Sequence, residues 1–98
     1  MEEIPAAAGL VLRATPNPFN PQTVLAFELA HDSDIVLEIF DIRGARLARP
    51  AEGHYPAGTV QVRWDGKDAS GRNLSSGTYL ARLTAGGAVA TTKLVLAR

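Results

Sequence analysis

A glycine-rich stretch beginning at Asp65 is the part of the sequence best equipped for chemistry. It reads Asp65-Gly66-Lys67-Asp68-Ala69-Ser70-Gly71 and spaces oxygen-bearing side chains much as a calcium-binding loop does. Calcium takes about six to eight oxygen ligands, and no Glu follows this stretch to supply a bidentate carboxylate. The commoner role of Asp in such a loop is to cap a turn by accepting nearby backbone N–H groups. We therefore expect no bound metal, with Asp65, Asp68 and Ser70 as weak candidates for ligands.

The two histidines are the next candidates for chemistry. His31 and His54 are predicted to lie on different turns, without a Ser, Cys or carboxylate at a recognisable catalytic spacing. The chain has no cysteine, which excludes disulfides, thiolate metal sites and cysteine nucleophiles. Its glycines form neither a dinucleotide-binding pattern nor a phosphate-binding loop. The sequence therefore predicts a protein that is not an enzyme and that needs no cofactor or small-molecule substrate.

Trp64 could serve as a flat platform for a sugar. It alternates in step with Val60 and Val62, however, so we expect it to face the core. A carbohydrate-binding module needs an exposed aromatic platform, and most of the three Phe, two Tyr and one Trp fall in rows predicted to face inward. Carbohydrate binding is therefore the weakest of the functional alternatives.

The composition limits the classes of partner. Ten basic and ten acidic residues cancel over 98 residues, and neither sign is concentrated in one half of the chain. This balance gives no electrostatic signal for nucleic acid or for an anionic membrane. No apolar run approaches the roughly 20 residues of a membrane-spanning helix, so we expect no membrane insertion. The first residues lack the basic start and apolar run of a signal peptide.

Alternation of apolar and polar residues with a period of two runs through most of the chain. Such alternation, broken by turn residues about every eight to twelve positions, is typical of a β-sandwich with one buried row per strand. The rows predicted to face the core are Leu25/Phe27/Leu29, Ile35/Leu37/Ile39, Val60/Val62/Trp64, Tyr79/Ala81/Leu83 and Ala90/Thr92/Leu94/Leu96. Weaker strands are expected at 10–14 and 45–49. About seven strands predict an all-β, immunoglobulin-like antiparallel sandwich.

Turn residues divide these strands. Extended or turn segments are expected at 16–21, 31–34 and 41–44, a long connection at 65–77, and a two-residue hairpin of the primed type at Gly86-Gly87. The expected organisation is a flexible N-terminal segment, residues 1–9, followed by one sandwich domain at 10–98.

Six short motifs, in order along residues 14–98, resemble two related groups of bacterial domains. One group is the C-terminal sorting domains of proteins secreted by the type IX (Por) system, and the other is the immunoglobulin-like domain of the flagellar hook-capping protein. The motifs are Pro16-Asn17-Pro18-Phe19-Asn20-Pro21, Phe40-Asp41 with Gly44, Pro56-Ala57-Gly58-Thr59, Trp64-Asp65-Gly66-Lys67-Asp68-Ala69-Ser70-Gly71, Ser76-Gly77-Thr78-Tyr79 and Lys93-Leu94-Val95-Leu96-Ala97-Arg98.

Three of the motifs also have a structural rationale. The residues Pro56-Ala57-Gly58 are expected to turn the chain into a core strand. Gly77 is expected to let Tyr79 enter the core edge-on, with its hydroxyl bonded to the backbone as in a tyrosine corner. The loop from Asp65 to Gly71 is expected to close one end of the sandwich.

The resemblance implies that the C-terminal segment is a signal. In sorting domains the export machinery recognises a terminal segment with a lysine, an apolar run and a closing basic residue. Here Lys93, Leu94, Val95, Leu96 and Arg98 match that arrangement, which implies passage through the periplasm to the cell surface or the medium. We expect a partner to recognise the segment by pairing with an exposed sheet edge. The alternative is a last strand whose charges merely protect an edge from aggregation.

A second function remains open. The W-D-G-x-D-x-x-G pattern favours the hook-capping type, for which the role would be structural assembly, with other protein subunits as partners. In either case the expected partner is a protein: the export machinery or a neighbouring subunit.

Overall fold

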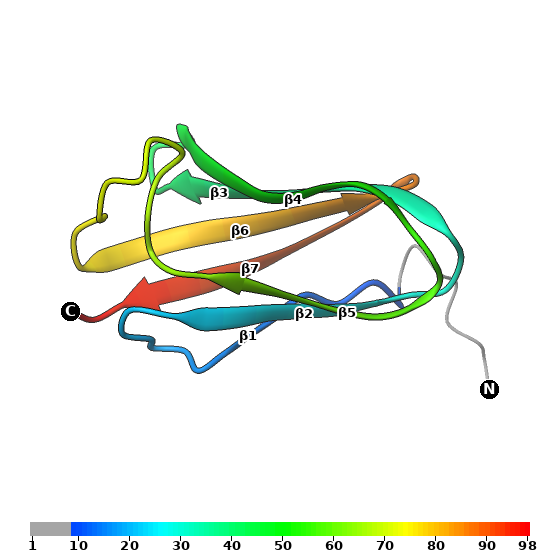
Figure 1. Cartoon of the computed structure of the whole chain (residues 1–98), viewed down its shortest axis with the longest axis horizontal. Helices are drawn as coiled ribbons and strands as arrows, with labels where there is room; N and C mark the ends of the chain where they lie inside the picture. Colours follow the sequence, from blue (N-terminus) through cyan, green and yellow to red (C-terminus); the bar gives the residue numbers. More distant parts are fainter. Residues whose placement is uncertain (1–8) are drawn as a thin grey trace.

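In the computed structural model, which describes residues 9–98, the chain folds into two packed antiparallel sheets (Figure 1). The first sheet has the order β1-β2-β5, and the second has the order β4-β3-β6-β7. The seven strands are β1 (Arg13–Thr15), β2 (Thr23–Leu29), β3 (Ser33–Asp41), β4 (Arg46–Tyr55), β5 (Gly58–Trp64), β6 (Gly77–Ala85) and β7 (Ala88–Leu96). The predicted all-β immunoglobulin-like sandwich of about seven strands is confirmed. The expected flexible segment 1–9 lies, except for Gly9, outside the described residues.

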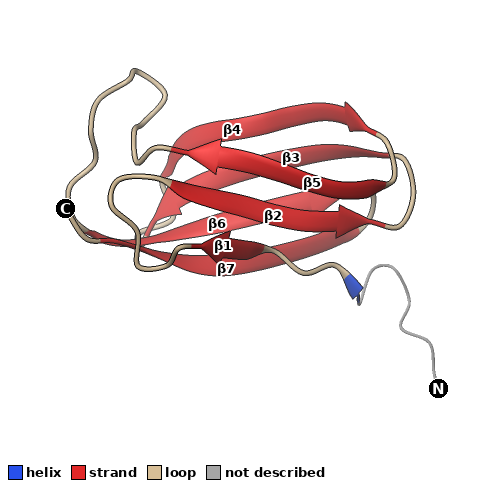
Figure 2. Cartoon of the chain, turned by 60° about the horizontal axis from the view of Figure 1, so that its bottom comes forward, coloured by secondary structure: helices blue, strands red, loops and turns tan. Residues whose placement is uncertain are grey.

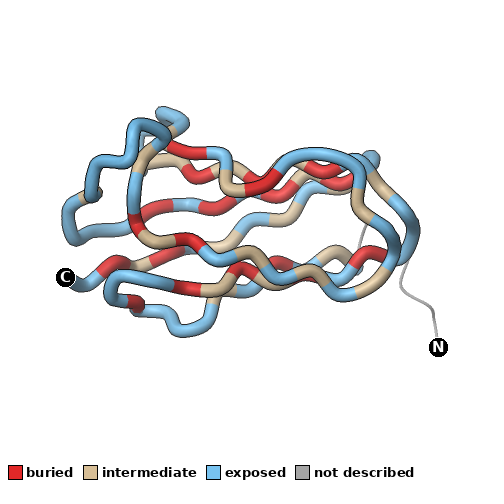
Figure 3. The backbone as a smooth tube through the Cα atoms, in the orientation of Figure 1, coloured by how far each residue is buried: buried red, intermediate tan, exposed pale blue. Residues whose placement is uncertain are grey.

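The core lies between the sheets and is built from the predicted rows (Figure 3). Leu37, Ile39 and Leu94 are fully buried, because alternate side chains of β3 and β7 point between the two sheets. Phe27, Trp64 and Tyr79 are also buried, as expected. Four members of the predicted rows are only half-buried: Val60, Val62, Ala90 and Thr92.

Two strands differ from the expected bounds. The first begins at Arg13, so the strand expected at 10–14 is displaced toward the C-terminus. The fourth runs from Arg46 to Tyr55 and continues past Pro50, although 45–49 was expected. Proline is tolerated there because β4 is at the edge of its sheet and because the register shifts between Leu37 and Ile39. The bounds expected for this strand, 45–49, were therefore wrong at its C-terminal end.

The predicted Gly86-Gly87 hairpin is present. Ala85 pairs with Ala88 across the two glycines, and Gly86 has a φ of +59°. A positive φ at the first central position belongs to a primed turn, whose twist matches that of the flanking strands. This hairpin brings β7 alongside β6.

Three aromatic side chains close one end of the core. The rings of Phe19 and Trp64 are 5.6 Å apart, and the ring of Tyr79 meets Trp64 edge-on at 6.2 Å. The indole N–H of Trp64 donates to the carbonyl of Lys67 at 3.1 Å, and the hydroxyl of Tyr79 donates to the carbonyl of Ser75 at 2.6 Å. The expected backbone partner for Tyr79 is confirmed. Trp64 is 4% exposed and therefore offers no platform for a sugar.

Candidate interaction site

The proline-rich segment after β1 covers the backbone edge of the last strand. Phe19 forms a parallel bridge with Leu96: its N–H donates to the carbonyl of Val95, and its carbonyl accepts the N–H of Ala97, both at 2.9 Å. The Phe19 side chain is 2% exposed, so the bridge is anchored by a ring buried in the core. Figure 2 shows β1 and β7 side by side, although they belong to different sheets.

Asn17 extends the cover with its side chain. Its Nδ2 donates to the carbonyl of Lys93 at 2.7 Å, and its Oδ1 accepts the N–H of Val95 at 2.9 Å. A primary amide offers a donor and an acceptor in one plane, so this side chain imitates the peptide group of a neighbouring strand. Pro16 and Pro18, on either side, have no N–H to donate, and the side chain of Asn17 supplies the missing donor.

This cover contradicts the expectation that the C-terminal segment stands at an exposed edge. The outward-facing backbone groups from the carbonyl of Lys93 to the N–H of Ala97 are already bonded within the chain. A partner strand could pair there only after residues 17–19 had been displaced. Recognition of the folded segment must therefore use its side chains.

Arg98 points toward a loop of its own chain. Its Nε donates to the carbonyl of Leu74 at 2.6 Å, its Nη2 donates to the carbonyl of Gly66 at 3.0 Å, and its backbone N–H donates to Oγ of Ser76 at 2.9 Å. A planar guanidinium can hold two acceptors at once, which an ammonium on a flexible stem does poorly. Arg98 thus fastens the 65–76 loop to the end of β7.

Gly66 makes this contact possible. It is buried with a φ of +72°, and a Cβ there would lie 3.0 Å from Nη2 of Arg98 and 3.2 Å from the carbonyl oxygen of Pro21. Any other residue would be strained in the backbone and would press on these atoms. The glycine of the W-D-G motif therefore provides space for the Arg98 guanidinium.

Asp68 organises the rest of the loop as an Asx turn. Its Oδ1 accepts the N–H of Ser70 at 2.9 Å, the hydroxyl of Ser70 at 2.7 Å and the N–H of Arg72 at 3.0 Å. These bonds, that of the Ser70 side chain first, lower the pKa of Asp68 below its ordinary value. The predicted turn-capping role is confirmed for Asp68, whereas the described residues show no such bond at Asp65. Residues 9–98 contain no cluster of three or more His, Asp or Glu side chains that could hold a metal.

The residues predicted as a sorting signal separate into two faces. Leu94 and Leu96 are fully buried in the core, whereas Lys93 and Val95 lie on the outer face of their sheet, exposed and half-buried respectively. Four other motif residues lie together at the end of the sandwich where β7 ends: Phe19, Trp64, Gly66 and Tyr79. Gly71 is exposed in the loop, Gly77 begins β6, and Gly58 pairs with Leu29 at the opposite end.

The histidines differ from expectation in one respect. His31 is exposed in the turn after β2, as expected, but His54 lies on β4 and not on a turn. Its Nδ1 is 2.9 Å from Oδ1 of Asp34, because the register of β3 and β4 places these two residues opposite each other. Both side chains are largely solvent-exposed, so the pair is a surface contact.

A cluster of charges on the outer face of the second sheet was missed by the sequence analysis. The carboxylate of Glu38 forms ion pairs with the guanidinium groups of Arg82 at 3.1 Å and Arg46 at 3.4 Å. The guanidinium of Arg49 lies 4.0 Å from the same carboxylate. Desolvation raises the pKa of Glu38, but the hydrogen bonds and charges of Arg82 and Arg46 outweigh it and bring the pKa below its ordinary value. The guanidinium of Arg82 also lies 4.6 Å from the centre of the Phe40 ring.

Residues 14–88 match the model of the FlgD Ig-like domain family, which is more than half of the chain. This chain belongs to that family. The search of curated proteins found no match to this chain. Within residues 9–98 no helix is long and apolar enough to cross a membrane.

Solved structures support the same fold for this FlgD Ig-like domain. It is similar to a dimeric latent PorU from Porphyromonas gingivalis, with a TM-score of 0.71, 18% identity, and coverage of 87% of this chain and 9% of that one. For FlgD from P. aeruginosa the TM-score is 0.59 and the identity 25%, over 92% of this chain and 67% of that one. For PorZ of P. gingivalis, a surface component of the type IX secretion system, the values are 0.55 and 17%, over 89% and 11%. The chain thus spans about a tenth of PorU and PorZ, and two thirds of FlgD.

Proposed function

We propose that this FlgD Ig-like domain is a non-catalytic, metal-free module that sorts or anchors a secreted bacterial protein through contacts with other proteins. Ig-like domains of this kind generally mediate protein–protein interactions. The fold shared with PorU and with the surface component PorZ supports a place in type IX export, and a destination at the cell surface or in the medium.

The observation that carries the proposal is the position of Lys93. Its carbonyl is bonded to Asn17, but its side chain is exposed and bonds to no other described residue. In the signal that the sequence resembles, a lysine precedes the apolar run. The ammonium of Lys93 and the half-buried Val95 are therefore parts of the segment that a receptor can contact without unfolding the domain.

The test is export of a reporter fused ahead of the full chain, in a bacterium that has a type IX system. We expect the fusion to carry the reporter from the periplasm to the surface, and Lys93→Glu to retain it in the periplasm. The matched control is Arg63→Glu, an exposed cation on the other sheet. Arg98→Glu is unsuitable, because Arg98 is bonded to the 65–76 loop and its loss would disturb the fold.

A second role, structural assembly, is favoured by a separate observation. FlgD from P. aeruginosa is 25% identical, and this chain covers 67% of it. Retention of the reporter in the periplasm by the intact, folded domain would remove the sorting role and favour assembly. Equal export of Lys93→Glu and of the unaltered domain would show that this charge is not recognised.

A further inference from the structure

One row of side chains on the outer face of the second sheet has the composition of an interface. Arg46, Phe40, Leu80 and Lys93, here called the Phe40 row, are successive cross-strand partners on β4, β3, β6 and β7. The outer face of a two-layer antiparallel sandwich is ordinarily polar. Here Phe40 is half-buried and Leu80 is 41% exposed, so two large apolar side chains occupy the middle of the row. Cations stand at both of its ends.

The charges around the row do not balance. Arg46, Arg49, Arg82 and Lys93 are cationic, whereas the carboxylates among them are those of Glu38 and Glu52. The chain as a whole has no net charge, so this excess of positive charge is local. A ligand that carries carboxylates and an apolar side chain would complement both features of the face.

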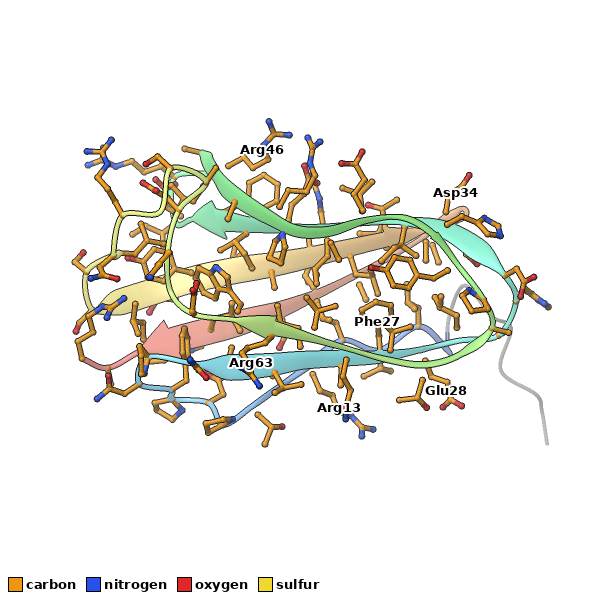
Figure 4. The ribbon with its side chains drawn as sticks, viewed as in Figure 1. Arg13, Phe27, Glu28, Asp34, Arg46 and Arg63 are labelled. Carbon is orange, nitrogen blue, oxygen red and sulfur yellow. The ribbon has the colours of Figure 1, made fainter. Side chains whose placement is uncertain are left out.

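Two of the cationic side chains, Arg82 and Arg46, are already held in place. Arg82 is bonded to Glu38 at 3.1 Å and lies over the Phe40 ring, and Arg46 is bonded to the same carboxylate at 3.4 Å. A side chain ordered before binding loses less conformational entropy when a partner arrives. Arginine and aromatic residues are also the types that contribute most to protein interfaces. Figure 4 shows Arg46 projecting from one outer side of the sandwich and Arg13 from the opposite side.

The length of the row sets the spacing of the ligand. Neighbouring strands are about 4.8 Å apart, so Arg46 and Lys93 at the two ends of the row are separated by about 14 Å. In an extended peptide, residues i and i+4 are also about 14 Å apart and face the same side as residue i+2. Carboxylates at i and i+4 would reach the two cations, while an apolar residue at i+2 would rest on Phe40 and Leu80.

We infer that the Phe40 row binds an extended acidic protein segment of the pattern Glu-x-Leu-x-Glu, which crosses the strands. Such a ligand needs no free sheet edge, which agrees with the cover of Lys93 to Ala97 by residues 17–19. The inference goes beyond the proposed function, because it holds whether or not export machinery recognises the last strand. Its test uses the chain alone in solution, so its failure is distinct from a failure of reporter export.

The experiment is a titration of the isotope-labelled full chain with the peptide Ser-Glu-Ser-Leu-Ser-Glu-Ser, capped at both ends, followed by NMR. We expect the amide signals of Phe40 and Leu80 to shift. The double variant Arg46→Gln/Lys93→Gln should bind about three- to tenfold more weakly, since two exposed ion pairs are lost. The matched control Arg13→Gln/Arg63→Gln, on the outer face of the other sheet, should bind like the unaltered chain.

A second peptide, Ser-Ser-Glu-Leu-Glu-Ser-Ser, has the same composition with its carboxylates two residues apart, and it should bind more weakly. Equal binding of the two peptides, equal binding by the two double variants, or no shift at millimolar peptide would overturn the inference. The inference would also be overturned if the amide signals of Phe40 and Leu80 shifted with a sulfated polysaccharide but not with either peptide. Shifts of Phe40 and Leu80 on simple concentration of the chain would assign the face to self-association instead.

Discussion

The backbone N–H of Val95 is bonded to a side chain 78 positions earlier in the sequence, that of Asn17, at 2.9 Å. The same amide donates to the carbonyl of Lys93, so one side chain occupies two positions on the edge of β7. An open edge is a site of unwanted pairing between chains, and natural sheets cover or charge such edges. Here residues 17–19 cover the edge, so the segment after β1 is bonded to the last strand of the domain.

Replacing Asn17 by Ala should lower the free energy of unfolding by about 1–3 kcal/mol, because two hydrogen bonds of about 0.5–1.5 kcal/mol each are lost. Urea unfolding would measure this change, and the amide of Val95 should exchange faster with deuterium. Asn73→Ala is the matched control, since Asn73 is exposed in the loop. Unchanged stability together with unchanged exchange at Val95 would contradict the role assigned to Asn17.

Trp64→Ala should destabilise the domain by about 3–5 kcal/mol, as expected for loss of a large buried aromatic side chain. The indole lies between the rings of Phe19 and Tyr79, so its removal leaves a cavity in the core. Thermal unfolding measures the effect. Ile42→Ala, at a side chain that is 75% exposed, serves as the control. Similar melting temperatures for the two variants would remove Trp64 from the centre of the core.

The sequence predicted most of the core because its signal is local. Alternation places Leu37 and Ile39 on one side of β3 whatever the rest of the chain does. The backbone partner of Tyr79 was predictable for the same reason, since the carbonyl of Ser75 lies only four positions away. The extension of β4 past Pro50 was missed, because the cost of a proline depends on whether a strand is at an edge, which its own sequence does not show.

The contacts of the candidate site were missed because they join distant segments. A basic residue after an apolar strand has the same sequence pattern whether it faces a receptor or bonds to internal carbonyls, as Arg98 does. Of the three arginines around Glu38, Arg46 and Arg49 lie on β4 and Arg82 lies on β6, and only the register of β3 with these two strands brings them together. Neither arrangement has a fixed spacing that could have revealed it.

The lowered pKa of Glu38 gives a dependence of stability on pH with a defined sign. A carboxyl whose pKa is lower in the folded state stabilises the fold above its unfolded pKa, and this contribution is lost as the pH falls through the folded pKa. The stability difference between the unaltered domain and Glu38→Gln should therefore be constant near neutral pH. It should begin to shrink at about the ordinary value of 4.5.

Urea unfolding of both proteins at a series of pH values from about 7 to 2 would measure this difference. Asp68 has a lowered pKa as well, but it is present in both proteins, so its contribution cancels. Salt should reduce the difference, because part of it is the attraction between Glu38 and the partly exposed Arg82 and Arg46. A difference that stays constant down to the lowest pH would show that ionisation of Glu38 does not contribute to stability.

Arg98→Ala should loosen the 65–76 loop, because the variant loses the guanidinium bonds to the carbonyls of Gly66 and Leu74. The loss of stability should be about 1–2 kcal/mol, at the lower end for charged hydrogen bonds because Arg98 is exposed. The clearer measurement is exchange of the Leu74 amide, which donates to the carbonyl of Gly66 at 2.9 Å and should exchange faster.

Arg98→Lys should recover only part of the effect, since an ammonium does not span both carbonyls as a guanidinium does. Arg72→Ala is the matched control, since the Arg72 side chain is 84% exposed and its Nε lies 3.9 Å from Oδ2 of Asp68. Equal exchange at Leu74 in the Arg98 and Arg72 variants would mean that Arg98 does not hold the loop, and its charge would then be free for a partner to recognise.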